Sequence, residues 1–403
     1  HNSEFTKDGE LSYSHHLYTD TLRYVLGKKS VPRRIEAKSG TATTPSPLPI
    51  WYQLLALKEE KINLLNSGRS WYSLPIRQGQ SLTINFRKNA GTAAPWLLHA
   101  RLMSQSYSPS SIRVWTDAEQ LEEVIFSPIS NSTYAIKGDE VRIYKTFNPK
   151  GDRLDQLRFS FQGVGSGHLD AALVGIPFTN STLKEGLFFG KKENPIALET
   201  GLQTWEISDF YQPIRYTQGK SALGKKWILF LPKNAKELGN FKAIIPKSTK
   251  PNSPNLMVIT VPQLKQVAQQ FQEFKASQGI PTQVVFTSEI YDWMGYGNPD
   301  VSAIRNYIAQ EYHQGKQLRN VLFLGKGTFD YKKKLGGRPN LVPIYTSRSS
   351  LDPLTTYSSD DYFGILDWGS GEWEESKSGD AGLQIGVGRV PAITFAEAKS
   401  WLE

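Results

Sequence analysis

The hydrophobic periodicity of the chain changes at about residue 250, and this change constrains the fold more than any other feature. Before it, short segments alternate apolar and polar residues, as in 81–86, 111–115 and 157–161. A period of two is typical of half-buried antiparallel strands. Because turn residues recur between these segments, the first part of the chain is predicted to form one or more antiparallel β-sandwich domains.

Continuous apolar runs replace the alternation after this point. Segments 256–260, 283–286 and 320–324 predict parallel strands that are covered on both faces. Between them, apolar residues recur at helical spacing within 264–274 and 301–308. This alternation of strand and helix predicts a parallel α/β sheet with right-handed crossovers.

Ligands of such sheets bind at the carboxyl ends of the strands, so the loops at Thr260, Ser288 and Gly325 are the expected places for a site. Residues 325–328 (Gly-Lys-Gly-Thr) resemble half of a phosphate loop, but a glycine interrupts the required Gly-Lys-Ser/Thr run and no helix pattern follows. The glycine-rich run 163–168 leads into another strand. It is better explained as a tight connection, and a nucleotide-binding enzyme remains only a distant alternative.

Composition and charge restrict the number of domains and the classes of function that the chain can have. The chain has 403 residues, which predicts two to four domains, and a net charge of +9. Residues 1–250 carry +11 and the remainder −2, but the basic residues are scattered rather than clustered with stacking aromatic residues, which argues against nucleic-acid binding. No cysteine is present, which excludes disulfides, thiolate metal sites and a cysteine nucleophile within these residues.

The start of the chain and its apolar runs bear on targeting. The longest apolar runs are far shorter than the roughly twenty residues that span a bilayer. The chain opens with His and shows no signal peptide. We therefore expect an interior piece of a longer protein, or a processed product.

An acidic pair near the end of the chain is the most informative candidate for chemistry. Asp360 and Asp361 lie in the segment Ser-Ser-Asp-Asp-Tyr-Phe, ahead of a loop that contains Asp367, Glu372 and Glu374. Paired carboxylates beside strand ends suit either the orientation of a catalytic histidine or the ligation of Ca²⁺. The residues alone favour a simpler interpretation, a helix N-cap beside an exposed acidic loop.

Six segments in order are similar to the first part of the gingipain cysteine-peptidase domain, which has a caspase-like α/β fold: 255–260, 278–281, 300–305, 321–325, 359–363 and 386–391. Upstream, 63–69 (Asn-Leu-Leu-Asn-Ser-Gly-Arg) with Trp71 and Tyr72 resembles the sortases of type IX secretion systems within this family, as do 168–170 and 204–208. Ser73 and Leu74 depart from the family, which usually carries Gly-Glu there.

The resemblance implies a cell-surface cysteine peptidase that removes C-terminal secretion domains from cargo proteins and can transfer the acyl group to anionic lipopolysaccharide. It implies as partners the secreted cargo, an outer-membrane β-barrel protein and anionic lipopolysaccharide, at the extracellular face of the bacterial outer membrane. Asp360 matches the residue that orients the catalytic histidine. The matching cysteine and histidine lie after residue 403, so these residues alone are expected to be inactive. No cofactor is expected, and Ca²⁺ is left open.

The resemblance also suggests where the domains begin and end. We expect a β segment and linker at 1–48, a jelly-roll-like β-sandwich at 49–179, a β-rich connecting domain at 180–250, a noncatalytic gingipain-like α/β subdomain at 251–350, and the start of the catalytic caspase-like subdomain at 351–403. The alternative function is a noncatalytic β-sandwich module that binds glycan or an outer-membrane partner through its basic surface. A glycan-binding assay across a salt series would distinguish the two.

Overall fold

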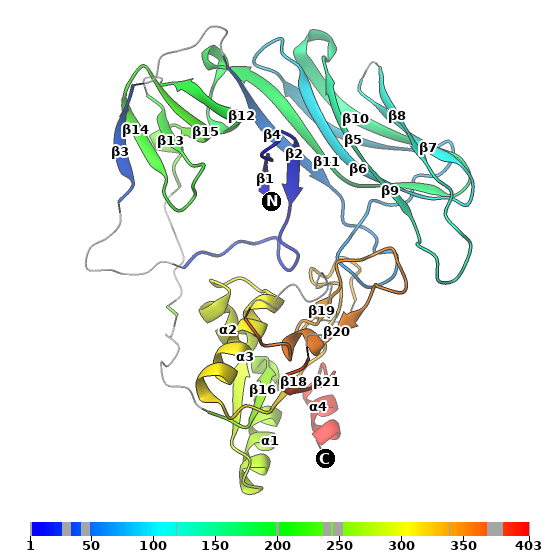
Figure 1. Ribbon diagram of the computed structural model, residues 1–403, viewed down its shortest axis with the longest axis vertical. Coiled ribbons are helices and arrows are strands. Elements are labelled where there is room, and N and C mark those ends of the chain that lie inside the picture. Colours follow the sequence, from blue (N-terminus) through cyan, green and yellow to red (C-terminus); the bar gives the residue numbers. More distant parts are fainter. Residues whose placement is uncertain are drawn as a thin grey trace. The chain divides into compact units, whose positions relative to one another are not determined.

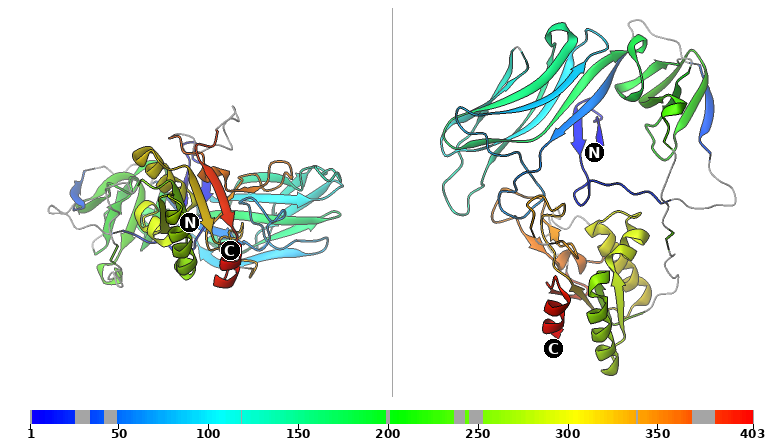
Figure 2. Two further views of the ribbon diagram at one scale, coloured as in Figure 1. Left: turned by 90° about the horizontal axis from the view of Figure 1, so that it is seen from below. Right: turned by 180° about the vertical axis from the view of Figure 1, so that it is seen from behind.

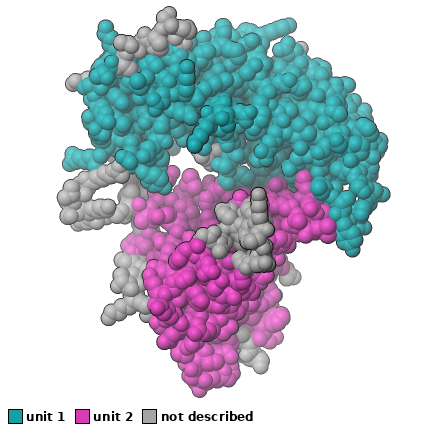
Figure 3. Space-filling model, viewed as in Figure 1, with its two compact units in different colours: residues 1–15, 28–62, 71–240 teal, residues 16–27, 63–70, 241–403 magenta. Residues whose placement is uncertain are grey.

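The computed structural model describes residues 2–25, 34–41, 49–117, 119–198, 201–236, 243–244, 253–337, 339–368 and 382–402. The chain divides into two compact units (Figure 3). Unit 1 comprises residues 1–15, 28–62 and 71–240, and unit 2 comprises residues 16–27, 63–70 and 241–403. Two short segments from the first part of the chain therefore belong to the second unit. Residues 42–48 of the predicted linker lie outside the described part of the chain.

Unit 1 is built from strands (Figure 1). In the described residues, its largest sheet has nine strands, and every neighbouring pair is antiparallel except β14 and β3. In sheet order these strands are β3 (Glu36–Gly40), β14 (Ile214–Gly219), β13 (Gln203–Glu206), β15 (Ser221–Phe230), β12 (Gly186–Ala197), β4 (Ile50–Lys58), β11 (Ser166–Thr179), β6 (Trp96–Gln105) and β9 (Asp139–Phe147).

A second, four-stranded antiparallel sheet faces part of the first. Its order is β5 (Ser81–Asn89), β10 (Arg153–Gln162), β7 (Ser110–Trp115) and β8 (Gln120–Phe126). A hairpin of β1 (Asn2–Phe5) and β2 (Leu11–Ser14) lies against the nine-stranded sheet, and the right view of Figure 2 shows it in blue near the N-terminus. Three short 3₁₀ helices complete the unit: η1 (Lys150–Asp152), η2 (Asn180–Thr182) and η3 (Pro232–Asn234).

The core of the sandwich follows from the alternation in the sequence. On β10, Leu157, Phe159 and Phe161 are fully buried, whereas the residues between them are partly exposed. They pack against alternate residues of β6, including Trp96 and Leu98, in one cluster that draws on both sheets. Each such side chain stabilises the fold by roughly 1.5–3 kcal/mol on burial. The predicted β-sandwich is confirmed.

Unit 2 contains a four-stranded parallel sheet in the described residues, of order β17 (Thr282–Phe286), β16 (Leu256–Thr260), β18 (Asn320–Leu324) and β21 (Gly386–Val390). Its helices are α1 (Lys265–Ser277), α2 (Thr287–Met294), α3 (Val301–Gly315) and α4 (Phe395–Leu402), with 3₁₀ turns η4 (Pro262–Leu264) and η5 (Asp361–Phe363). A short hairpin pairs β19 (Tyr345–Thr346) with β20 (Ser358–Ser359). The predicted parallel α/β sheet is confirmed.

The structure corrects one expected loop. Ser288, expected in a loop, lies in the first turn of α2, which begins directly after β17. The Glu289 carboxylate accepts a hydrogen bond from the Phe286 amide (3.0 Å) and so satisfies a backbone donor at the start of this helix. Among the described residues, no helix has the length and apolar character needed to cross a membrane.

Candidate functional site

The predicted site residue Asp360 pairs with Arg389 in unit 2. Asp360 follows β20 directly, and Arg389 is the fourth residue of β21. The Arg389 guanidinium binds both carboxylate oxygens, through Nε to Oδ2 and Nη2 to Oδ1, each at 2.7 Å. This two-pronged geometry is the strongest form of such a pair because both hydrogen bonds are charge-assisted. It fixes the Asp360 carboxylate beside the end of the sheet.

The remaining donors of Arg389 hold three backbone carbonyls. Nη1 donates to Gly325 O (2.8 Å) and Val342 O (2.7 Å), and Nη2 reaches Pro343 O (3.4 Å). The Phe323 ring lies under the guanidinium, 4.9 Å from its carbon. With its side chain only 10% exposed, Arg389 thus connects β18, the segment after it and Asp360.

The loop 325–328, which resembles half of a phosphate loop, has three of its four amides occupied by contacts within the fold. The Gly325 amide donates to Val390 O and the Lys326 amide to Ala392 O, each at 2.9 Å. The Thr328 amide donates to the Asn340 side chain (3.2 Å). In the described residues, the next helical element after this loop is η5, at Asp361–Phe363. These observations argue against a nucleotide site there, because a phosphate loop needs free amides at a helix N-terminus.

Thr260, another expected position, has a structural role. Its buried hydroxyl donates to Leu324 O (2.6 Å) and so links the ends of β16 and β18. The carboxyl end of the sheet is therefore closed by internal hydrogen bonds at Thr260 and Gly325. Asp360, whose side chain is 18% exposed, remains accessible there.

The β19–β20 hairpin carries Asp360 and is held by the loop 63–70. The amides of Arg69 and Ser70 both donate to Ser350 Oγ, each at 2.9 Å. Arg69 Nε donates to Thr346 O (2.9 Å), and its guanidinium lies 4.9 Å from the centre of the Tyr345 ring. Tyr345 pairs with Ser359 across the hairpin, and Ser359 directly precedes Asp360. Arg69 therefore contacts the strand that lies opposite the residue before Asp360.

Glycine is required at one position of this loop. Gly68 has φ of +75°, a conformation that costs other residues roughly 1–2 kcal/mol. A Cβ atom there would lie 2.4 Å from both Ser349 O and Ser350 Oγ, which is too close for any non-bonded contact. The loop can therefore approach the segment before Asp360 this closely only with glycine at position 68.

The other side of the hairpin is held by aromatic residues. The Tyr345 and Tyr362 rings are stacked with centroids 4.3 Å apart. Burial raises the pKa of Tyr331 to about 12, so its hydroxyl stays protonated, and it donates to Ile344 O (2.6 Å). Tyr18, from the segment 16–27, packs on Tyr331 with ring centroids 4.5 Å apart. Both early segments of unit 2 thus contribute to the support of the Asp360 region.

No histidine partner of Asp360 is present among the described residues of unit 2. His313 binds Leu366 O (3.1 Å) and stacks on Trp368, and His16 accepts from the Tyr18 amide through Nδ1 (3.3 Å). In the part of the chain that is described, no three residues of the types His, Cys, Asp and Glu gather as metal ligands do. Residues 369–381, which include Glu372 and Glu374, lie outside that part.

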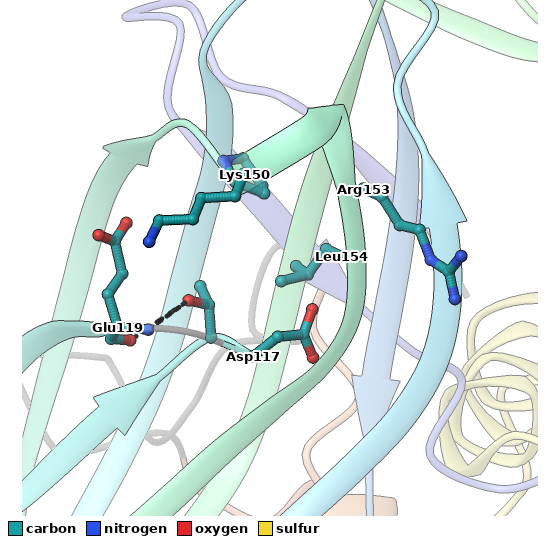
Figure 4. Close-up of a pocket in the computed structure, with 7 residues that line it drawn as sticks. Asp117, Glu119, Lys150, Arg153 and Leu154 are labelled. Atoms are coloured by element: carbon teal, nitrogen blue, oxygen red, sulfur yellow. Dashed lines mark hydrogen bonds between the residues drawn. The ribbon is translucent and has the colours of Figure 1, made fainter.

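A small pocket in unit 1 has mixed charge. It is lined by Asp117 and Glu119 and by Lys150 and Arg153, with Leu154 at its base. Figure 4 shows Lys150 extending toward Glu119, whereas Arg153 points away from the pocket. The Asp117 carboxylate accepts from the Asp155 amide (2.8 Å), a contact within the fold. With both signs of charge and contacts already made, this pocket indicates no particular ligand.

The comparison with family models decides which kind of domain unit 2 contains. Residues 249–403 match the model of peptidase family C25. This range includes Asp360, Arg389 and the whole parallel sheet. The resemblance to gingipain-like peptidases that the sequence predicted is confirmed. No curated protein sequence matched the chain.

Solved structures extend the likeness beyond the C25 region. The crystal structure of dimeric latent PorU from Porphyromonas gingivalis matches 99% of this chain and 42% of its own, with a TM-score of 0.76 and 15% identity. The chain thus spans 42% of the length of that protein, and at this identity the match establishes the fold alone. A carbohydrate-binding module of Cellvibrio mixtus lichenase 5A matches 30% of this chain and 95% of its own at 14% identity, but its TM-score of 0.21 supports no argument.

Two arginines of the site could not be assigned from sequence alone. Arg389 directly follows Gly388 in a short strand that also contains Gly386, and Arg69 follows a glycine in a loop. A charged residue inside an otherwise apolar strand is a signal for a buried partner, because burying an unpaired charge is very unfavourable. That signal points to Arg389 but does not reveal that Asp360 is the partner.

Proposed function

We propose that the chain is part of a gingipain-like cysteine peptidase that acts as a sortase of the type IX secretion system. Two findings support this proposal: the match of residues 249–403 to peptidase family C25 and the likeness of the fold to PorU. In this role the protein would cleave C-terminal secretion domains from cargo and transfer the acyl group to anionic lipopolysaccharide. Its place would be the outer face of the bacterial outer membrane, with a β-barrel protein as partner.

The observation that carries the proposal is the fixed position of Asp360 within the C25 region. Arg389 uses one acceptor site on each carboxylate oxygen. A carboxylate offers about four such sites, so Asp360 retains the capacity to accept an N–H from an imidazole. A carboxylate in this position keeps the imidazole in the correct tautomer and stabilises the imidazolium during proton transfer.

The reaction is an acyl transfer in two steps. A cysteine thiolate attacks the scissile carbonyl, and the imidazolium gives its proton to the leaving amine, which leaves a thioester. Water or an acceptor amine then attacks the thioester while the imidazole accepts a proton, and the thiolate is released. These 403 residues contain no cysteine, so they supply the scaffold and Asp360 rather than the nucleophile.

Cleavage assays test the proposal directly. A protein that joins these residues to the nucleophile and the histidine should cleave a purified cargo protein at its C-terminal secretion domain, and a thiol reagent should abolish the activity. The 403 residues alone should give no cleavage. Failure of the longer protein to cleave any such cargo, or thiol-independent cleavage by the 403 residues, would overturn the proposal.

A further inference from the structure

Four side chains form a patch on one face of the nine-stranded sheet in unit 1. Strands β6 and β9 are antiparallel neighbours, with His99 opposite Tyr144 and Arg101 opposite Arg142. Residues two apart on a strand point to the same face. The four side chains therefore lie together, and we call them the arginine patch.

The two arginines of this patch are poorly neutralised. Like charges directly opposite each other on a sheet are destabilising. Arg101 binds Asp170 through Nε and Oδ2 (2.9 Å), but the same carboxylate also pairs with Lys58. Arg142 is exposed and makes no ion pair or hydrogen bond with any described residue. The Asp170 carboxylate thus neutralises only part of the charge of Lys58 and Arg101. Arg142 adds a further positive charge without an ion-pair partner among the described residues.

An aromatic surface lies beside these charges. The Tyr144 ring stacks on His99 with centroids 4.3 Å apart and an angle of 17° between the ring planes, and Tyr144 is 43% exposed. His99 is only 8% exposed, and its Nε2 has no hydrogen-bond partner among the described residues. Burial lowers the pKa of His99, and the charges of Arg101 and Arg142 lower it further. The Leu11 backbone and the Asp170 carboxylate act on this pKa in the opposite direction. The stacked pair thus lies beside two arginines and one carboxylate that already binds Arg101 and Lys58.

We propose that the arginine patch binds an acidic sugar. The anionic group, a carboxylate or a phosphate, would bind Arg142 and Arg101, because a guanidinium matches both groups in shape and charge. The sugar ring would lie on the exposed part of Tyr144, whose rigid ring offers an apolar surface with a polar tip. This inference does not depend on peptidase activity, since it concerns a different unit of the chain.

The size of the patch favours a sugar over a nucleic acid. Nucleic-acid binding needs a stripe of basic residues that follows several phosphates, usually with several stacking rings. Here two guanidinium groups and one exposed ring lie on two strands. That arrangement fits one anionic group attached to one ring.

Binding to the 403-residue chain tests the proposal, measured by titration calorimetry at low and high salt. The probes are trigalacturonic acid, glucose 6-phosphate, inorganic phosphate and neutral maltotriose. We expect one or both acidic sugars to bind with an affinity that falls with salt. Arg142→Gln should weaken this binding about tenfold or more, as expected for the loss of a hydrogen bond to a charged group. Arg77→Gln, which removes an exposed arginine elsewhere in unit 1, should leave it unchanged.

A further variant tests the contribution of the aromatic ring separately from that of the charge. Tyr144→Ala should weaken the binding of the acidic sugar and leave that of inorganic phosphate unaffected. Preference for trigalacturonic acid would identify a carboxylate, and preference for glucose 6-phosphate a phosphate. The proposal is overturned if maltotriose binds as well as the acidic sugars, if no acidic sugar binds, or if Arg77→Gln and Arg142→Gln weaken binding equally. Thermal unfolding of each variant confirms that unit 1 remains folded.

Discussion

Replacing Gly68 with alanine is the sharpest test of how the Asp360 region is supported. The substitution places a Cβ atom 2.4 Å from Ser349 O and from Ser350 Oγ. It also imposes the positive φ of +75° on alanine, which costs roughly 1–2 kcal/mol. To relieve the contact, the loop must move away from Ser350, and the hydrogen bonds from the Arg69 and Ser70 amides to Ser350 Oγ are lost. Each contributes about 1 kcal/mol.

Together these effects should destabilise the contact between loop 63–70 and the hairpin by about 3–4 kcal/mol. Hydrogen exchange is the appropriate assay because a chain with two units need not unfold in one step. In Gly68→Ala the amides of Arg69 and Ser70 should exchange about 10²–10³-fold faster than in the unmodified chain, since 1.4 kcal/mol corresponds to a factor of ten.

Gly79→Ala is the matched control. Gly79 has nearly the same φ, +76°, but no heavy atom lies within 4 Å of a Cβ placed there. It should therefore show only the cost of the backbone conformation. If Gly68→Ala perturbs exchange around its own position no more than Gly79→Ala does around Gly79, the close approach of the loop is not what holds the hairpin.

Three further predictions concern other buried groups. Burial lowers the pKa of His168, so the stability that the neutral imidazole contributes is present above the unfolded pKa of about 6.5 and is lost as the pH falls toward the folded pKa. The urea midpoint of unfolding should therefore fall between about pH 7 and pH 5.5, and His168→Gln should make this fall smaller. An unchanged slope would contradict this prediction. Lys58→Met leaves Asp170 with less compensation in a buried position and should lower the unfolding free energy by about 3 kcal/mol in urea, whereas a change below 1 kcal/mol would show that Arg101 suffices. Arg389→Lys loses the two-pronged contact and should destabilise unit 2 by about 2 kcal/mol, an effect that unaltered thermal unfolding would refute.

Local periodicity was sufficient to predict most regular elements. The run 256–260 coincides with β16, and the helical spacing within 301–308 lies in α3, because burial on both faces and helical spacing leave clear patterns in short segments. Helix α2 was missed because it is short and follows β17 without a loop. The start of this helix is stabilised by the hydrogen bond from the Phe286 amide to the Glu289 carboxylate. That contact forms only when the backbone already has its helical turn, so the strand pattern before it gave no sign of it.

Contacts between distant residues were beyond the reach of the sequence. Asp360 and Arg389 are 29 residues apart in the sequence, and their side chains meet only in the folded chain. Arg69 and Thr346 are separated by 277 residues. No periodicity records such pairings, so the sequence could name Asp360 through family resemblance but could not reveal what holds it. The five predicted domain ranges and the histidine-orienting role of Asp360 remain predictions.

The central claim is that Asp360 orients a catalytic histidine and is more than the partner of Arg389. The most direct test compares kcat for Asp360→Asn and Arg389→Lys in a protein that joins these residues to the nucleophile and the histidine. Both variants lose the two-pronged contact between charged groups, but only Arg389→Lys keeps the carboxylate. We predict that kcat falls by about 10³–10⁴ in Asp360→Asn at nearly unchanged KM, and far less in Arg389→Lys. Equal losses in the two variants, or an unchanged kcat in Asp360→Asn, would contradict the account.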